Sequence, residues 1–163
     1  MKYLSKLKQM RVSVWKQRTT FVIQISGKMT RFKFGTRTKA KRLLEVVHTD
    51  VVGPITPLSH CGEKYFVTFV DDFSNFIQVF MIKNKSDVFD WFKQLVLMVQ
   101  TRFNLKIATL RCDNGSKYSS QEFKEFCRMN GTCIDYTIPY TPEQNGKAEC
   151  FNRSLMDKAR AMM

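Results

Sequence analysis

Residues 44–52 read LEVVHTDVV, an apolar and β-branched run that contains one Asp, at position 50, and ends at Gly53-Pro54. Such a run, closed by Gly-Pro, predicts a buried strand. An isolated buried carboxylate is very costly, so Asp50 is expected to be hydrogen-bonded, paired or bound to a metal ion. The segment therefore predicts both the start of a sheet and a first candidate functional residue.

The residues after this strand alternate between strand and helix patterns. Their order, β-β-β-α-β-α-β-α, implies an α/β fold with a five-stranded mixed sheet flanked by helices. The expected strands are 44–52, 64–70, 76–82, 107–110 and 132–138; the expected helices are 87–103 with Ser86 as N-cap, one from Ser119 or Ser120 to Asn130-Gly131, and one from about Thr141-Pro142 to the chain end.

The positive charge of the chain is concentrated near its start. The 163 residues include 27 Lys and Arg against 14 Asp and Glu, and residues 1–42 hold 13 of the basic residues and no acidic one. A segment this basic is expected to attract a polyanion through counterion release, most commonly a nucleic acid. A solvated tail without a dedicated partner stays open, and an acidic membrane surface is disfavoured because no amphipathic helical pattern accompanies the charge.

The composition excludes several protein classes. No apolar run approaches the length of a membrane span, and residues 1–10 do not resemble a secretory signal, so no membrane partner is expected. Five Cys without a C-x-x-C pair argue against a disulfide scaffold or a zinc ribbon.

Three carboxylates stand out by their positions. Asp50 lies in the first strand, Asp113 follows the fourth, and Glu149 lies on the last helix, four residues after Asn145. If the first and fourth strands are neighbours, Asp50 and Asp113 lie side by side, and the helix could add Glu149. If they converge without an adjacent Lys or Arg, the three carboxylates would repel one another unless a divalent cation, Mg²⁺ or Mn²⁺, lies between them. The pattern alone leaves open a structural Asp50 and a solvated Glu149.

Six motifs make the chain resemble the integrase of copia-type long-terminal-repeat retrotransposons, which has a retroviral-type catalytic core. They are GKMTR (27–31), LEVVHTDVVGP (44–54), YFVTFVDDFS (65–74), RCDNG (111–115), PYTPEQNGKAE (139–149) and NRSLM (152–156). The resemblance implies a ribonuclease H-like fold with Asp50, Asp113 and Glu149 as catalytic residues and ligands of two metal ions. Between the last two lie 35 residues, the spacing of the D,D-35-E triad. The activity it implies is 3′-end processing of element DNA and its transfer into target DNA.

Further expectations follow from this resemblance. Element-end and target DNA would be the partners, contacted by Lys28, Arg31, Asn145, Lys147 and Arg153; a helix contact for Asn145 and ordinary exposed charges for Lys147 and Arg153 stay open as alternatives. The protein would form a homo-oligomer and act in the nucleus after synthesis in the cytoplasm.

Three neighbouring acidic or basic residues are assigned structural roles. Asp71 and Asp72 are expected to serve the hairpin turn. His48, two residues before Asp50, is expected to pack or hydrogen-bond rather than bind a metal.

The sequence also departs from the family pattern. Phe21 and Gln24 stand where a Cys pair is usual, so residues 1–42 are interpreted as a basic arm that retains a degenerate zinc-binding region, and no zinc is expected. Ser116 and Lys117 replace the usual Gly-Glu after Asp113-Asn114-Gly115, and Cys150 replaces a basic residue after Glu149.

The catalytic core is expected over residues 43–163, without the family's remaining helices. The chain stops at Met163, so Leu155, Met156, Met162 and Met163 on the last helix are expected to be left exposed. Two other functions stay open: a catalytically inactive nucleic-acid-binding remnant of a retroelement, and ribonuclease H-type hydrolysis.

Overall fold

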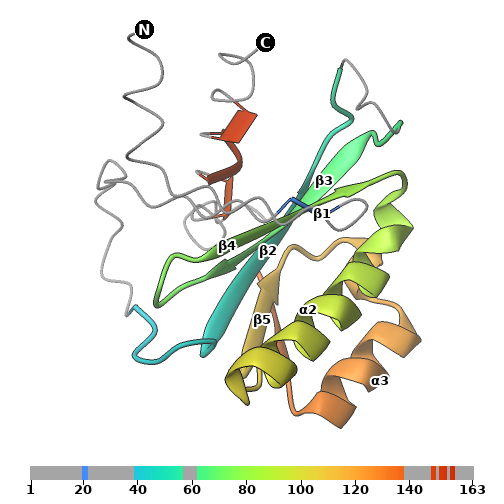
Figure 1. Ribbon diagram of the computed structural model, residues 1–163. Coiled ribbons are helices and arrows are strands. Elements are labelled where there is room, and N and C mark those ends of the chain that lie inside the picture. The colour runs from blue at the N-terminus through green and yellow to red at the C-terminus, as the bar shows by residue number, and fades with distance from the viewer. Residues whose placement is uncertain are drawn as a thin grey trace, which may run out of the picture.

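The strands form one mixed sheet in the order β1-β4-β3-β2-β5-β6 (Figure 1). This computed structural model describes residues 20–21, 39–56, 62–137, 148–149, 151–153 and 155–156. Strands β2, β3 and β4 are consecutive and antiparallel, whereas β5 and β6 join the other side of β2 in parallel. The strands are β1 (Thr20–Phe21), β2 (Val46–Val52), β3 (Tyr65–Asp71), β4 (Ile77–Ile82), β5 (Thr109–Cys112) and β6 (Cys133–Tyr136).

The sheet confirms the predicted five mixed strands and adds a sixth. Thr20 and Phe21 of β1 pair antiparallel with β4, although they lie in the segment predicted as a basic arm. The fourth predicted strand is shifted by two residues, from 107–110 to β5 (Thr109–Cys112). The shift follows from the start of β2: Leu44 has a positive φ of 60°, β2 begins at Val46, and Val46 pairs with Thr109.

The first two predicted helices lie where the periodicity predicts them, except that the N-terminus of the first one differs. The structure has the 3₁₀ turns η1 (Lys85–Asp87) and η2 (Ser116–Tyr118), and the α-helices α2 (Val88–Phe103) and α3 (Gln121–Asn130). Ser120 caps α3 by accepting the Phe123 N–H at 3.3 Å, and Gly131 ends it in the left-handed conformation. Ser86 is not the N-cap of α2, because η1 precedes that helix and Asp87 takes the N-cap position.

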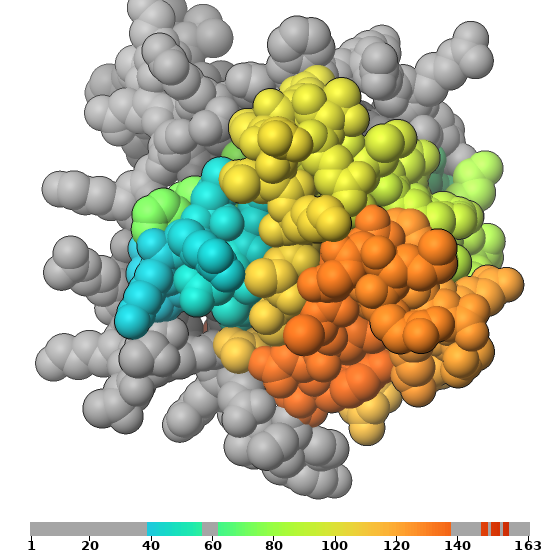
Figure 2. All heavy atoms as spheres, turned by 90° about the horizontal axis from the view of Figure 1, so that it is seen from below, coloured from blue at the N-terminus to red at the C-terminus, as the bar shows by residue number. Residues whose placement is uncertain are grey.

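Both α-helices cover the same face of the sheet, and Figure 2 shows them side by side on the surface seen from below. Their apolar sides and the facing strand residues form the larger core, in which Phe92 is fully buried. The Phe92 ring stacks on Phe123, with centroids 5.2 Å apart, and lies 6.0 Å from Phe69 of β3. The residues predicted at helical spacing in α2 therefore hold the helix on the sheet.

The opposite face carries a second, smaller core. There Phe151 packs with Phe66, Val70, Ile77 and Val79. Residues 148, 149, 151–153, 155 and 156 are helical (Figure 1). The two side chains at 155 and 156 are partly buried against this core, so their expected exposure was wrong: the apolar side of this helical segment rests on the sheet. Within the part of the chain that the structure describes, no helix is long and apolar enough to cross a bilayer.

Candidate functional site

The parallel pairing of β2 and β5 brings two of the predicted carboxylates together. His48 of β2 pairs with Arg111 of β5, so the same register places Asp50 opposite Asp113, the first residue after β5. The two carboxylates lie close enough to repel each other. The predicted proximity of Asp50 and Asp113 is therefore confirmed.

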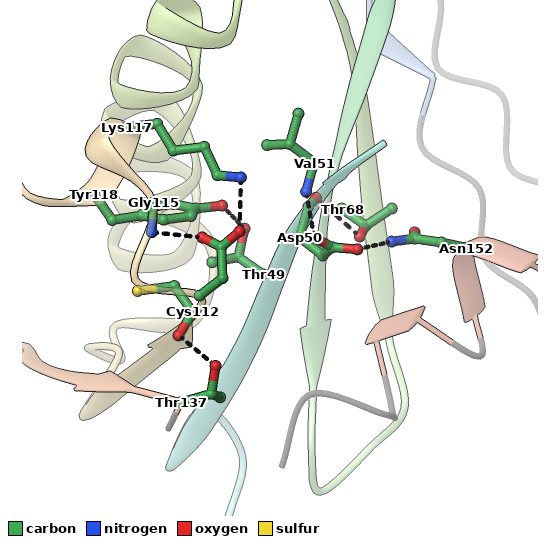
Figure 3. Close-up of polar contacts among 11 residues, drawn as sticks. Thr49, Asp50, Val51, Thr68, Cys112, Gly115, Lys117, Tyr118, Thr137 and Asn152 are labelled. Atoms are coloured by element: carbon green, nitrogen blue, oxygen red, sulfur yellow. Dashed lines mark hydrogen bonds and ion pairs between the residues drawn. The ribbon is translucent and has the colours of Figure 1, made fainter. Parts of the chain in front are cut away.

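Asp50 is oriented by two hydrogen bonds (Figure 3). Its Oδ1 accepts the Val51 N–H at 2.8 Å, and its Oδ2 accepts the Asn152 Nδ2–H, also at 2.8 Å. Burial raises the pKa of the Asp50 carboxyl, the repulsion from Asp113 acts in the same direction, and the two hydrogen bonds and the charge of Lys117 oppose both. Asp50 is thus held by protein donors while its charge stays unfavourable.

Asp113 is held by the turn that follows it. Its Oδ1 accepts the Gly115 N–H at 3.2 Å, so the backbone of this Asn-Gly turn holds the carboxylate. Its Oδ2 accepts the Lys117 ammonium at 3.0 Å, and the Lys117 side chain is only 12% exposed (Figure 3). A basic side chain therefore lies beside the carboxylate pair, because the 3₁₀ turn η2 brings Lys117 back towards Asp113.

A buried tyrosine fixes this turn to the sheet. The Tyr118 hydroxyl hydrogen-bonds the Thr49 hydroxyl at 2.9 Å, and the Tyr118 carbonyl accepts the Tyr136 hydroxyl at 2.8 Å. Tyr118 is fully buried, and burial raises its pKa well above the ordinary value. Burial also raises the pKa of Cys112 to about 12, so that thiol is protonated at neutral pH.

Glu149 lies on the helical segment that contacts Asp50 but does not join the other two carboxylates. Its side chain is exposed, whereas Ala148, Phe151 and Asn152 of the same segment are buried. Asn152, three residues later, is the residue that reaches Asp50. Among the described residues, no three His, Cys, Asp or Glu side chains form a group that could hold a metal ion.

The predicted meeting of three carboxylates is therefore not observed, and a pair is observed instead. Lys117 is the cation beside this pair. For the carboxylate of Glu149, leaving water would cost solvation free energy, and the two aspartates would repel it.

The other acidic residues and the His have the structural roles predicted for them. Asp71 is buried at the end of β3, where its carboxylate accepts the Leu44 N–H at 2.8 Å and the Ser74 N–H at 2.7 Å. Asp72 accepts the Ala40 N–H at 2.7 Å and lies 3.3 Å from the buried His48 Nε2. His48 therefore contacts a carboxylate.

Only one of the five predicted DNA contacts, Arg153, lies within the described residues. Lys28, Arg31, Asn145 and Lys147 lie outside the described residues, and their roles stay predictions. Arg153 is exposed on the helical segment, next to the buried Asn152.

The sequence matches the family model described as "Integrase core domain" over residues 40–142. The chain belongs to the integrase core domain family. The match includes Asp50 and Asp113, and it starts at Ala40, the residue whose N–H ties the chain to Asp72.

Two curated relatives agree with this membership. The chain is 41% identical over 138 residues to the retrovirus-related Pol polyprotein from transposon TNT 1-94 of Nicotiana tabacum, which covers 84% of this chain and 10% of that protein. It is 27% identical over 144 residues to the transposon Ty1-DR4 Gag-Pol polyprotein of Saccharomyces cerevisiae, covering 84% of this chain and 9% of that one. This integrase core thus spans about a tenth of the length of these polyproteins, and the predicted retrotransposon-type resemblance is confirmed.

Solved structures show the same fold. A chain of the simian T-cell lymphotropic virus intasome, in complex with the PP2A regulatory subunit B56 gamma, superposes with a TM-score of 0.63 at 18% identity, over 83% of this chain and 48% of that one. The catalytic core domain of BIV integrase superposes with a TM-score of 0.53 at 19% identity, over 72% and 70%. The fold of this integrase core is therefore the predicted ribonuclease H-like one.

Two residues that contact the carboxylates have no role predicted from the sequence. Asn152 lies three residues after Glu149, a spacing that places the two near each other on a helix. Lys117 departs from the family pattern, and its spacing of four from Asp113 is compatible with a local ion pair. Both contacts were missed because they depend on how a turn or a helix docks against the sheet.

Proposed function

We propose that this integrase core carries out divalent-metal-dependent 3′-end processing of DNA and strand transfer, with Asp50, Asp113 and Glu149 as its acidic residues. The observation that carries the proposal is the register of β2 and β5, which sets Asp50 opposite Asp113 in a chain of this family. The proposed partners are element-end and target DNA. The proposed setting is a homo-oligomer in the nucleus, reached from the cytoplasm.

The side chains of the carboxylate pair are chemically suited to bind a hard divalent cation. Asp50 and Asp113 offer only oxygen, the ligand that Mg²⁺ and Mn²⁺ prefer, and the neighbouring Cys112 stays protonated. Glu149 lies one helical turn from Asn152, the residue that touches Asp50, so a side-chain rotation or a shift of this segment would be needed to bring it in. A bound pair of divalent ions would supply activation of a hydroxyl nucleophile and stabilisation of the leaving oxygen.

The residues around the carboxylates would orient them. Asn152 and the Val51 N–H fix the Asp50 carboxylate in place, and the Gly115 N–H does so for Asp113. The bond between Tyr118 and Thr49 holds the turn after Asp113 against β2. Such fixed carboxylates reduce the reorganisation that would otherwise accompany the reaction.

A strand-transfer assay tests the proposal. The purified chain, incubated with Mn²⁺ and an end-labelled oligonucleotide duplex, is expected to nick or join the DNA, and Asp113→Asn is expected to abolish the products. Asp90→Asn, which changes an exposed aspartate on α2, is the matched control and should retain activity. A product that survives Asp113→Asn would contradict the assignment.

A second candidate is a catalytically inactive nucleic-acid-binding remnant, and the contact of Lys117 with Asp113 favours it. The same assay separates the two if DNA binding is measured beside the products. The remnant would bind DNA with an affinity that falls steeply as salt rises, and would yield no product at any Mn²⁺ concentration. Ribonuclease H-type hydrolysis would show instead as cleavage of an RNA–DNA hybrid.

A further inference from the structure

Lys117 takes the position of a cation beside the carboxylate pair. Its ammonium lies 3.0 Å from Asp113 Oδ2, and its charge also acts on Asp50. The side chain is 12% exposed and its ammonium lies 5.2 Å from the centre of the Tyr118 ring. The Asp113 side chain is 42% exposed, so the shielding of this ion pair comes from the burial of Lys117.

A second pair in the same chain provides the comparison. Lys93 lies 2.6 Å from Asp90 and 4.4 Å from the centre of the Phe89 ring, so it makes the same two kinds of contact. Its side chain is 43% exposed and that of Asp90 is 71% exposed. Lys93 is exposed and pairs with one carboxylate, and such pairs contribute little, whereas Lys117 is mostly buried and its charge acts on Asp50 as well as on Asp113.

The carboxylate pair needs a positive charge from some source. Asp50 and Asp113 repel each other, and the hydrogen bonds from Asn152 and Gly115 come from neutral donors. A divalent ion and the Lys117 ammonium would therefore both be attracted to the Asp113 carboxylate, and each would disfavour the other by like-charge repulsion.

We propose that Lys117 is a built-in counter-cation that holds the Asp50–Asp113 pair in the metal-free protein and competes with divalent metal for Asp113. This inference rests on the proposed function, since it assumes that the carboxylate pair can take a metal ion. Metal binding then requires the Lys117 side chain to swing away from Asp113. Lys117 is thus a positioning residue, and it sets the concentration of divalent metal at which the site is occupied.

Mn²⁺ binding to the full chain tests the competition. Affinity is measured by titration calorimetry and by the loss of the free Mn²⁺ electron-spin signal, for wild type, Lys117→Met and Lys117→Glu. Lys117→Met is expected to bind Mn²⁺ about five- to tenfold more tightly than wild type, and Lys117→Glu more tightly still. Lys93→Met, the matched control, removes the same charge from the exposed pair and should leave the affinity unchanged.

Thermal unfolding adds a readout that does not depend on activity. Without metal, Lys117→Met should melt below wild type because the carboxylates lose their counter-charge, and Mn²⁺ should raise its melting temperature more than that of wild type. Circular dichroism at the start of each melt shows whether the variant is folded. If Lys117→Met does not fold, Lys117→Gln, which keeps most of the side-chain length, replaces it.

The outcomes separate the two proposals. Equal Mn²⁺ affinity in wild type and both Lys117 variants, lost in Asp113→Asn, would overturn the role of Lys117 and leave the proposed function in place. No Mn²⁺ binding in any folded protein, including Lys117→Glu, would overturn the metal-dependent function and the inference with it.

Discussion

The two faces of the sheet bury side chains of different kinds. The face covered by α2 and α3 holds an extended apolar cluster with the aromatic rings of Phe69, Phe92 and Phe123 at its centre. The opposite face holds a small apolar cluster around Phe151, and beside it Asp50 with its partner Asn152. One face thus has mostly apolar contacts, whereas the other combines a few apolar contacts with charge.

The difference shows how this fold separates stability from chemistry. Apolar burial stabilises without directional requirements, so it tolerates a long interface between helices and strands. A buried carboxylate costs free energy unless donors surround it, so it is confined to the point where β2, β5 and the helical segment meet. Substitutions on the two faces should therefore change the free energy of unfolding by different amounts and with different signs.

The largest expected effect is on the helix-covered face. Phe92→Ala should lower the free energy of unfolding by about 3–5 kcal/mol, because Phe92 is fully buried among aromatic rings and truncation leaves a cavity. Phe151→Ala on the opposite face should cost roughly half as much, since fewer buried residues surround it. Urea unfolding followed by fluorescence or circular dichroism measures both.

Phe103→Ala is the control for this pair. Phe103 ends α2 and is 54% exposed, so its truncation should change stability little. Equal losses in Phe92→Ala and Phe151→Ala would show that the two cores contribute alike, contrary to the comparison.

A smaller effect is expected at the buried hydrogen bond that ties the turn after Asp113 to β2. Tyr118→Phe should cost about 1–2 kcal/mol, because it leaves the buried Thr49 hydroxyl without this bond. Tyr136→Phe, which removes a bond from a partly exposed hydroxyl to the Tyr118 carbonyl, should cost less. Denaturant melts of the two single variants and of the double variant measure the losses. A Tyr118→Phe protein as stable as wild type would mean that this hydroxyl bond contributes nothing.

The smallest effect has the opposite sign. The pKa of Asp50 is raised in the folded protein, so the protonated form is favoured there, and stability from this group is fully present below its ordinary carboxyl pKa and lost as pH rises through the raised value. Asp50→Asn should therefore stabilise the metal-free chain at neutral pH by under about 1 kcal/mol, because solvent screens a partly buried group.

The pH dependence provides the check on that variant. The advantage of Asp50→Asn over wild type should shrink as the pH is lowered towards 4, where the wild-type carboxyl takes up its proton. Thermal melts between pH 4 and 8 in a metal chelator measure it. A constant difference across this range would show that the variant acts through the Asn152 hydrogen bond instead of through charge.

Much of the fold follows from local patterns that the chain carries in each segment. The hairpin β3–β4, helix α2 and the Ser120 and Gly131 ends of α3 each depend on neighbouring residues, and each was predicted from spacing and capping chemistry. The predictions that were wrong concern contacts with residues distant in sequence. β5 begins at Thr109 because it pairs with Val46, and Leu155 is partly buried because the sheet lies beneath it.

The same division holds at the site. The sequence motifs indicated Asp50, Asp113 and Glu149 as candidates, and they predicted that Asp50 and Asp113 lie side by side if the first and fourth strands are neighbours. The parallel register of β2 and β5 confirms that proximity. Only the tertiary structure decided which groups touch them: Asn152 reaches Asp50, Lys117 covers Asp113, and Glu149 stays exposed. The reason is physical: hydrophobic periodicity fixes which side of an element is buried, whereas a polar contact depends on the exact docking of a turn or helix, where small displacements make or break a hydrogen bond.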